Sequence, residues 1–313
     1  MSKNSLDKLF KETNTIIVDG ALATELEFLG CDLNDSLWSA KVLLEQPHLI
    51  KQVHYSYFDA GADVGISASY QATIDGFVKK GYSIEQAKEA IKQSMTLLNE
   101  ARNEWWNNVG QKTNRSFPLL AGSVGPYGAF LADGSEYNGN YNVSDERLKQ
   151  FHRSRIQLLW SNGAEILAAE TIPSLNEAKI IAELVSEING ECWISFSCKS
   201  EELISNGELI EDCAAELDSI KSVKAIGINC TPPQYVESLI KAIKRKTSKP
   251  IVVYPNSGLE YDSINKQWIG ENTCVSYHSY ASVWQKAGAS MIGGCCKTTP
   301  EMIKEVAKIL KDN

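Results

Sequence analysis

The stretch Met291-Ile292-Gly293-Gly294-Cys295-Cys296 is an apolar run that ends in two glycines and two adjacent thiols. A second run, Ala225-Ile226-Gly227-Ile228-Asn229-Cys230, also ends in a thiol. Short apolar runs bounded by polar residues are typical of strands that are buried on both faces, as in a parallel sheet. The two stretches therefore predict buried strands whose carboxyl ends carry three thiols. Adjacent cysteines rarely form a disulfide with each other, because the small ring strains the peptide between them.

Eight such runs alternate with helical patterns along the chain. The strands are predicted at residues 15–20, 63–70, 118–125, 165–171, 192–198, 225–230, 250–256 and 290–296. The helices are predicted at residues 5–12, 47–60, 83–106, 144–162, 174–188, 208–220, 233–246, 275–287 and 300–311. This alternation predicts α/β architecture with the (β/α)8 TIM barrel fold, as a single domain over residues 1–313. The alternative is an open doubly wound sheet, which the absence of a Gly-x-Gly-x-x-Gly motif after the first strand disfavours.

The composition excludes several classes of partner. The chain has 31 Lys+Arg against 39 Asp+Glu, a net charge of −8, and no basic run with interleaved aromatics, so we expect neither a nucleic acid partner nor an anionic membrane. No run approaches the roughly 18 apolar residues of a membrane span. Residues 1–7 lack the apolar core of a secretory signal. We therefore expect a cytoplasmic protein whose eight cysteines stay reduced, which favours thiolate or metal chemistry.

The predicted strand ends gather polar side chains at one end of the barrel, where such barrels carry their catalytic groups. These ends are Asp19-Gly20, Ser69-Tyr70, Ser123, Glu170-Thr171, Ser197-Cys198, Asn229-Cys230, Asn256 and Cys295-Cys296. One strand separates the sixth from the eighth, so Cys230 can approach Cys295 and Cys296. Three thiolates at zinc distance leave one tetrahedral position open for water or substrate. Gly293 and Gly294 are expected to permit the backbone turn that aims both following sulfurs at one ion.

These motifs resemble those of the homocysteine S-methyltransferase family, which consists of zinc-dependent barrels. The matching pieces span nearly the whole chain in order: Asp19-Gly20, Thr24 to Leu26, Ala60 to Asp63, Ser69 to Ala72, Gly122 to Gly128, Glu170-Thr171, Gly227 to Cys230, Tyr254 to Gly258 and Gly293 to Cys296. The paired Gly-x-Asn-Cys and Gly-Gly-Cys-Cys motifs are the most specific of them. The resemblance implies that Zn2+ is bound by Cys230, Cys295 and Cys296, and that homocysteine is methylated to methionine.

The resemblance also implies roles for the other strand-end residues. Homocysteine would be bound by Asp19, Gly20, Glu170 and Thr171, and Asn256 would occupy the fourth zinc position before substrate arrives. A sulfonium donor such as S-methylmethionine is cationic, so aromatic faces should hold it. Our candidates for that contact are Trp38, Tyr127 and Tyr141, the last two in a long loop predicted at residues 126–141.

A sulfonium donor leaves as a neutral thioether, so no general acid is required. This agrees with the four histidines, all of which fall in predicted helices: His48, His54, His152 and His278. The remaining cysteines are interpreted as small buried hydrophobes: Cys31, Cys192, Cys198, Cys213 and Cys274.

Several alternatives stay open at this point. The donor can be S-methylmethionine or S-adenosylmethionine, and the acceptor atom sulfur or selenium. A betaine-dependent methyltransferase and a zinc-binding protein without catalysis fit the same thiols. A zinc hydrolase is disfavoured, because thiolates donate charge and suit a soft sulfur ligand better than water. Only 17 residues follow Cys296, which leaves no room for the extension through which betaine-type relatives oligomerise, so we expect a monomer acting on small molecules.

Overall fold

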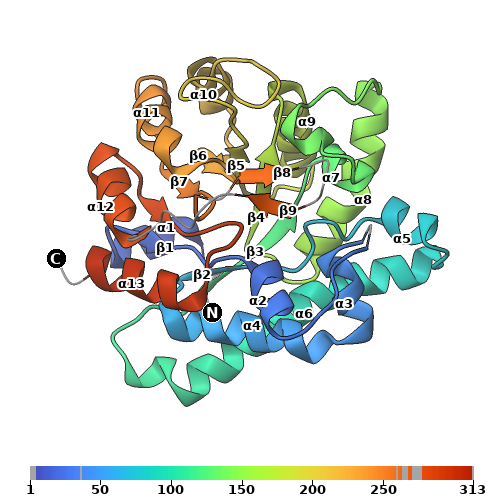
Figure 1. Cartoon of the computed structure of the whole chain (residues 1–313), viewed down its shortest axis with the longest axis horizontal. Helices are drawn as coiled ribbons and strands as arrows, with labels where there is room; N and C mark the ends of the chain where they lie inside the picture. The colour runs from blue at the N-terminus through green and yellow to red at the C-terminus, as the bar shows by residue number, and fades with distance from the viewer. Residues whose placement is uncertain (1–4, 36, 259, 263–266, 270–276, 312–313) are drawn as a thin grey trace.

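Eight parallel strands surround the centre of the molecule (Figure 1). The computed structural model describes residues 5–35, 37–258, 260–262, 267–269 and 277–311. The strands are β1 (Ile16–Ile17), β2 (Val64–Ile66), β3 (Leu119–Val124), β4 (Ile166–Ile172), β5 (Cys192–Phe196), β6 (Val223–Asn229), β7 (Ile251–Tyr254) and β10 (Met291–Ile292). Their order is β1-β10-β7-β6-β5-β4-β3-β2, and a parallel bridge between Val18 and Val64 joins the two ends. The predicted (β/α)8 barrel is confirmed.

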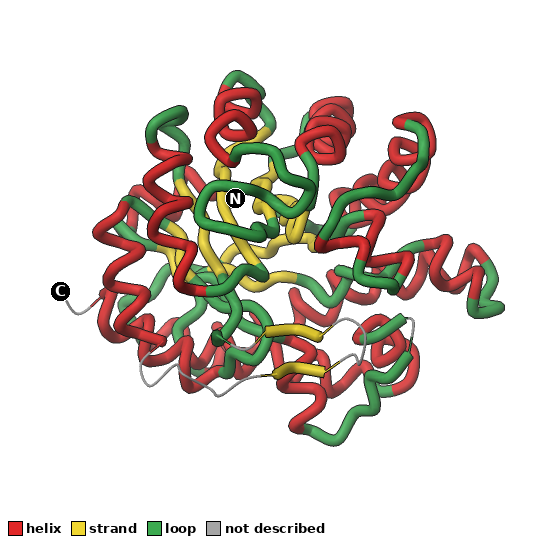
Figure 2. Tube along the Cα trace, turned by 45° about the horizontal axis from the view of Figure 1, so that its top comes forward, coloured by secondary structure: helices red, strands yellow, loops and turns green. Residues whose placement is uncertain are grey.

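Helices connect the strands and cover the outside of the barrel (Figures 1 and 2). They are α1 (Leu6–Glu12), α2 (Leu22–Phe28), α3 (Ser39–Glu45), α4 (Pro47–Ala60), α5 (Ile74–Lys79), α6 (Ile84–Asn108), α7 (Tyr127–Leu131), α8 (Asp145–Ser161), α9 (Leu175–Glu187), α10 (Ile210–Asp218), α11 (Pro233–Lys244), α12 (Tyr277–Ala287) and α13 (Pro300–Lys311). Serine caps begin several of them, and Ser83 forms a capping box with Gln86 at the start of α6.

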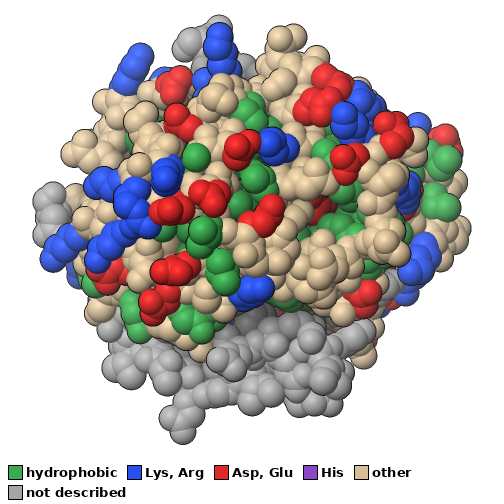
Figure 3. All heavy atoms as spheres, turned by 90° about the horizontal axis from the view of Figure 1, so that it is seen from above, with side chains coloured by type: hydrophobic (Ala, Val, Ile, Leu, Met, Phe, Trp, Pro, Cys, Tyr) green, Lys and Arg blue, Asp and Glu red, His purple; other side chains and the backbone are tan. Residues whose placement is uncertain are grey.

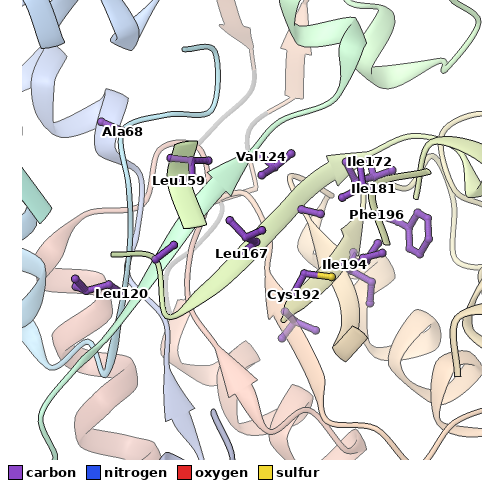
Figure 4. Close-up of a cluster of buried hydrophobic side chains, with 14 of the residues drawn as sticks. Ala68, Leu120, Val124, Leu159, Leu167, Ile172, Ile181, Cys192, Ile194 and Phe196 are labelled. Atoms are coloured by element: carbon purple, nitrogen blue, oxygen red, sulfur yellow. The ribbon is translucent and has the colours of Figure 1, made fainter. Parts of the chain in front are cut away.

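Alternating side chains divide each strand between two apolar clusters. The outward side chains pack under the helices, as Leu167 and Ile194 do beside Leu159 of α8 and Ile181 of α9 (Figure 4). The inward side chains form a smaller cluster, which Leu6 and Leu9 of α1 join at the amino-terminal end of the barrel. This alternation is the period of two expected of a strand. At the carboxyl end, the inward series changes from apolar to polar, for example from Ile166 and Ala168 to Glu170 on β4.

Charged side chains of both signs are interspersed on the face formed by α9 to α11 (Figure 3). Ion pairs link neighbouring helices there, with Lys179 to Glu216 at 2.6 Å and Arg245 to Glu211 at 2.6 Å. These pairs are exposed, so each contributes little to stability.

The structure differs from the sequence expectations at several places, beginning with the unpredicted helices α2, α3 and α5. The predicted loop at residues 126–141 contains the short helix α7 and a 3-10 turn, η2 (Ser135–Tyr137). After β7, two short strands, β8 (Glu260–Asp262) and β9 (Gln267–Ile269), form an antiparallel hairpin apart from the barrel (Figure 2). The eighth barrel strand contains only Met291–Ile292, because the residues after it bend to carry the thiols. Cys274 lies outside the described residues.

Gly227 permits the close approach of β6 and β7. A Cβ atom at this position would lie 1.7 Å from the carbonyl oxygen of Val252, which is backbone and cannot rotate away. Gly190, by contrast, faces only flexible side chains and a carbonyl at 3.2 Å or more. The glycine in the Gly-x-Asn-Cys motif is therefore required by packing between strands.

We expect Gly227→Ala to lower the free energy of unfolding by about 3 kcal/mol, at the upper end of the usual cost of overpacking. Urea unfolding followed by circular dichroism measures this change. The matched control is Gly190→Ala, for which we expect less than about 1 kcal/mol. Equal effects of the two substitutions would contradict the close-approach explanation.

Candidate active site

Three thiols converge at the carboxyl end of the barrel. Cys230 follows β6, and Cys295 and Cys296 follow β10. The Sγ atoms of Cys230 and Cys296 are 3.6 Å apart, those of Cys295 and Cys296 are 3.9 Å apart, and all three lie within 4.8 Å of one another. A tetrahedral zinc site with Zn–S bonds of about 2.3 Å has sulfur–sulfur edges of about 3.8 Å. The spacing of the thiols fits such a site.

Backbone hydrogen bonds from the end of β7 hold the two thiol segments together. Cys295 N donates to Pro255 O at 2.8 Å, and Ser257 N donates to Cys296 O at 3.1 Å. On the other side, Asn256 N donates to Thr231 O, next to Cys230, at 3.1 Å. The segment 255–257 therefore joins both halves of the thiol cluster.

Gly293 and Gly294 serve a purpose that differs from the one expected. Neither glycine has a positive φ, so the backbone turn does not need their conformational freedom. A Cβ at Gly293 would lie 2.7 Å from Asp19 O, and one at Gly294 would lie 2.4 Å from Oγ1 of Thr298. Their role is to let the thiol segment pack against the end of β1 and against Thr298.

The three thiols differ in their pKa values. Hydrogen bonds from Cys295 and Cys296 hold the pKa of Cys230 well below its usual range, whereas the hydrogen bond to Cys230 helps raise the pKa values of Cys295 and Cys296. Three buried thiolates repel one another, so a cation is needed to ionise all three together.

One further observation fits a metal at this position. Oδ1 of Asn256 is buried and accepts no hydrogen bond within the described part of the chain. An unsatisfied buried oxygen is unusual, and this one belongs to the segment that joins the two halves of the thiol cluster. The donor set, three thiols and an amide oxygen, suits a borderline-soft ion such as Zn2+.

Two carboxylates share the cavity with the thiols. Burial is the largest cause that raises the pKa of Asp19 well above its usual range, and burial raises the pKa of Glu170 to about 7. Asp19 Oδ2 accepts a hydrogen bond from Ile66 N at 2.8 Å, and Glu170 Oε1 accepts one from Ser123 Oγ. Among the described residues neither carboxylate has an ion-pair partner within 4.0 Å, so both can accept a cationic ligand.

Gly20 and Thr171 stand beside these carboxylates in the cavity wall. Thr171 has a φ of 60°, which is costly for a β-branched residue. Asn229 holds it there, since Oδ1 accepts from Thr171 N at 2.6 Å and Nδ2 donates to Thr171 Oγ1 at 2.8 Å. Gly20 packs so closely that a Cβ would lie 2.7 Å from the ring of Tyr57.

Backbone strain is concentrated at this cavity. Five of the seven described non-glycine residues with positive φ line it: Trp38, Ala132, Thr171, Cys230 and Lys297. Each such residue costs on the order of 1–3 kcal/mol and persists only where its surroundings enforce it. Such clustering is typical of functional sites.

The cavity has a volume of about 670 Å³, within the usual range for small-molecule sites. Its wall contains Trp38 as expected, and also Tyr70 and Tyr137. Trp38 and Tyr70 pack edge to face with centroids 6.3 Å apart, and Tyr137 Oη lies 3.4 Å from Cys230 Sγ. The two tyrosines were missed from the sequence, although Tyr70 ends a predicted strand and was a detectable candidate.

Tyr127 and Tyr141 are not brought to the described cavity wall. Tyr127 packs against both Phe151 and Tyr141, and a single buried carboxylate, Glu177, binds the two ends of their segment. Glu177 Oε1 accepts from Tyr127 N at 2.6 Å, and Oε2 accepts from Tyr141 Oη at 3.0 Å. His152 Nε2 completes this buried network 2.9 Å from Glu177 Oε1. The network fixes the segment that carries Tyr137 to the thiols.

The other described cysteines lie in apolar surroundings. Burial raises the pKa of Cys192 and of Cys213 to about 12, and raises that of Cys198 further. Cys31 is 8% exposed at the edge of the cavity. None of these four thiols joins the cluster of three among the residues that the structure describes.

The family model for homocysteine S-methyltransferase matches residues 16–310. The chain belongs to the homocysteine S-methyltransferase family. Within this family it is 51% identical to homocysteine S-methyltransferase YbgG of Bacillus subtilis, with 97% of each chain covered. It is 49% identical to selenocysteine Se-methyltransferase of Brassica oleracea, covering 98% of this chain and 92% of the relative.

Among solved structures of homocysteine S-methyltransferases, the metallated form of the homocysteine methyltransferase MmuM from Escherichia coli superposes with a TM-score of 0.88. It is 42% identical in sequence, and the match covers 97% of this chain and 99% of that one. The expected family and methyltransferase class are thereby confirmed. No helix within the described ranges has the length and apolar character required to cross a bilayer.

We expect Tyr141→Phe to lower the free energy of unfolding by about 1–2 kcal/mol, because it leaves an oxygen of buried Glu177 without its donor. The KM for the methyl donor should stay within twofold of the wild type, since Tyr141 lies outside the cavity wall. Urea unfolding and steady-state kinetics measure the two quantities. A tenfold rise in donor KM at unchanged stability would instead place Tyr141 in the donor site.

Proposed function

We propose that this chain transfers a methyl group from a sulfonium donor, S-methylmethionine in the first instance, to homocysteine, with Zn2+ held by Cys230, Cys295 and Cys296. The observation that carries the proposal is the convergence on one cavity of three thiols and two carboxylates that have no ion-pair partner among the described residues. Family membership supports the methyl transfer to homocysteine. The ion and the donor are inferred from the chemistry of the residues.

The two carboxylates suit the amino group of homocysteine. Asp19 and Glu170 are buried in the same wall, and the charge of Glu170 helps raise the pKa of Asp19. An ammonium placed between them would relieve this repulsion. Gly20 and Thr171 complete this end of the cavity and would border the amino acid portion of the substrate.

Zinc bound at the thiols would keep the sulfur of homocysteine ionised at neutral pH. Asn256, whose side-chain oxygen accepts no hydrogen bond from any described residue, would contact the metal before substrate arrives. Backbone hydrogen bonds of segment 255–257 fix the thiols in place before any ligand binds. Such preorganisation lowers the entropic cost of aligning the reacting groups.

No histidine is among the residues that line the described cavity wall. His54 and His152 are buried in α4 and α8, and burial lowers the pKa of each. A sulfonium donor needs no such acid, because its leaving group is a neutral thioether. The lack of a histidine in the described wall agrees with an onium donor. We further propose that the enzyme acts as a monomer on these small molecules.

A selenium acceptor is a second candidate. The relative from Brassica oleracea is named for selenocysteine, at 49% identity. Selenolates are soft ligands like thiolates, so the same metal site would accept them.

Cys230→Ser and Cys296→Ser are each expected to lose zinc and activity together, because a neutral hydroxyl replaces a thiolate ligand. Metal analysis of the purified proteins gives the zinc content, and methionine formation gives the activity. The control is Cys198→Ala, a strand-end thiol outside the cluster, which should keep a full equivalent of zinc. Full zinc content in either ligand variant would contradict the three-thiol site.

The donor assignment predicts that purified, zinc-loaded protein forms methionine from homocysteine and S-methylmethionine. Steady-state kinetics with S-methylmethionine, S-adenosylmethionine and betaine compares the candidates directly. We expect the highest kcat/KM with S-methylmethionine and none measurable with betaine. Turnover with betaine alone would overturn the sulfonium assignment.

A further inference from the structure

Glu136 lines the cavity beside the thiols. It is not among the residues proposed to bind zinc or homocysteine. It lies in η2, one residue before Tyr137, whose hydroxyl is 3.4 Å from Cys230 Sγ. Its Oε2 atom is buried and accepts no hydrogen bond from the described residues. A buried carboxylate oxygen without a donor is costly, so a ligand is the natural partner for it.

The backbone at Glu136 is firmly held. A Cβ at Gly128 would lie 2.4 Å from Glu136 N, so α7 packs directly against this turn. Ser197 Oγ donates to Glu136 O at 3.1 Å, which ties the turn to the end of β5. The Glu177 network described above fixes both ends of the same segment. The carboxylate is therefore presented by a rigid support.

Several other acids at the cavity already have partners. Lys297 lies 2.7 Å from Glu27, and Lys80 lies 2.9 Å from Asp35. Glu136 has no ion-pair partner within 4.0 Å in the described part of the chain. Burial raises its pKa to about 7, the response of a carboxyl group that lacks a nearby cation.

The surroundings of Glu136 suit an organic cation. After burial, the charge of Glu136 is the side-chain charge that most raises the pKa of the Tyr70 hydroxyl. It also helps raise the pKa of the Tyr137 hydroxyl. Trp38 packs edge to face against Tyr70. A carboxylate beside aromatic rings is the usual environment for a sulfonium or quaternary ammonium group.

We propose that Glu136 binds the positive charge of the methyl donor and so selects a cationic donor over a neutral one. This inference rests on the proposed function. In the transfer, the bond from the donor sulfur to its methyl carbon breaks as a bond from the homocysteine sulfur to that carbon forms. The bonding pair stays on the donor sulfur, which becomes a neutral thioether. Glu136 therefore attracts the donor before transfer and loses this attraction afterwards.

This charge change predicts a specific kinetic pattern. Because the donor's positive charge diminishes in the transition state, Glu136 stabilises the bound donor more than the transition state. Glu136→Gln should raise the KM for S-methylmethionine at least tenfold while kcat stays within threefold of the wild type or increases. The KM for homocysteine and the zinc content should not change. A residue with a structural role alone would not produce this split.

The experiment varies S-methylmethionine at saturating homocysteine for wild type, Glu136→Gln and the matched control Glu27→Gln. Glu27 is also at the cavity, but its charge is already paired with Lys297, so its substitution should change donor KM less than twofold. Equal donor KM values for wild type and Glu136→Gln, at normal turnover, would overturn the inference.

A binding measurement tests the same inference without turnover. Homoleucine is a neutral isostere of S-methylmethionine, with CH in place of the sulfonium sulfur. Calorimetric titration of zinc-loaded wild type should show at least tenfold weaker binding of homoleucine, and Glu136→Gln should reduce this ratio below threefold. Equal affinities in the wild type would refute selection by Glu136. Failure of every sulfonium donor to turn over, with this binding preference intact, would refute the proposed reaction instead.

Discussion

The site depends on the position of β7 between β6 and β10. Neighbouring strands are about 4.8 Å apart, so strands on either side of a third are separated by roughly 10 Å, yet the Cys230 and Cys296 sulfurs are 3.6 Å apart. The difference is bridged beyond the strand ends, where Cys230 adopts a φ of 50° and segment 255–257 binds both thiol segments. The cost of that conformation is offset by the hydrogen bonds that enforce it.

The cavity contains several buried acidic groups that are costly to ionise without a nearby cation. Three thiols compete for ionisation, Asp19 and Glu170 are buried near each other, and Glu136 Oε2 accepts no hydrogen bond from the residues that the structure describes. Each is relieved by positive charge: a metal cation for the thiols, an ammonium for the carboxylate pair, and an onium group for Glu136 in the proposal above. The rigid barrel supplies the free energy that holds these groups together before the cations arrive.

The barrel and the thiol cluster could be predicted because both follow local rules. Short apolar runs and serine caps are visible in the sequence, and the alternation of strands with helices places Glu170 and the thiols at one end. The aromatic contacts could not be predicted the same way. Tyr127 and Tyr137 lie in one aperiodic segment, and only a distant residue, Glu177, decides which of them faces inward. The sequence suggests that Gly293 is needed for a backbone turn. The structure shows instead that it is needed for close contact with the end of β1.

The charge change in the proposed reaction also explains how the products would leave the cavity. In the proposed reaction a cationic sulfonium and an anionic sulfur become two neutral thioethers, so the interactions with Glu136 and the metal that favoured the substrates weaken together. The carboxylates proposed to bind the amino group would keep their partner. Product release is then favoured at the donor end, because Glu136 is left there with a charge that only a new cation would pair with. A neutral product would be replaced by a cationic donor without any movement of the barrel, which agrees with a site held by backbone hydrogen bonds on rigid strand ends.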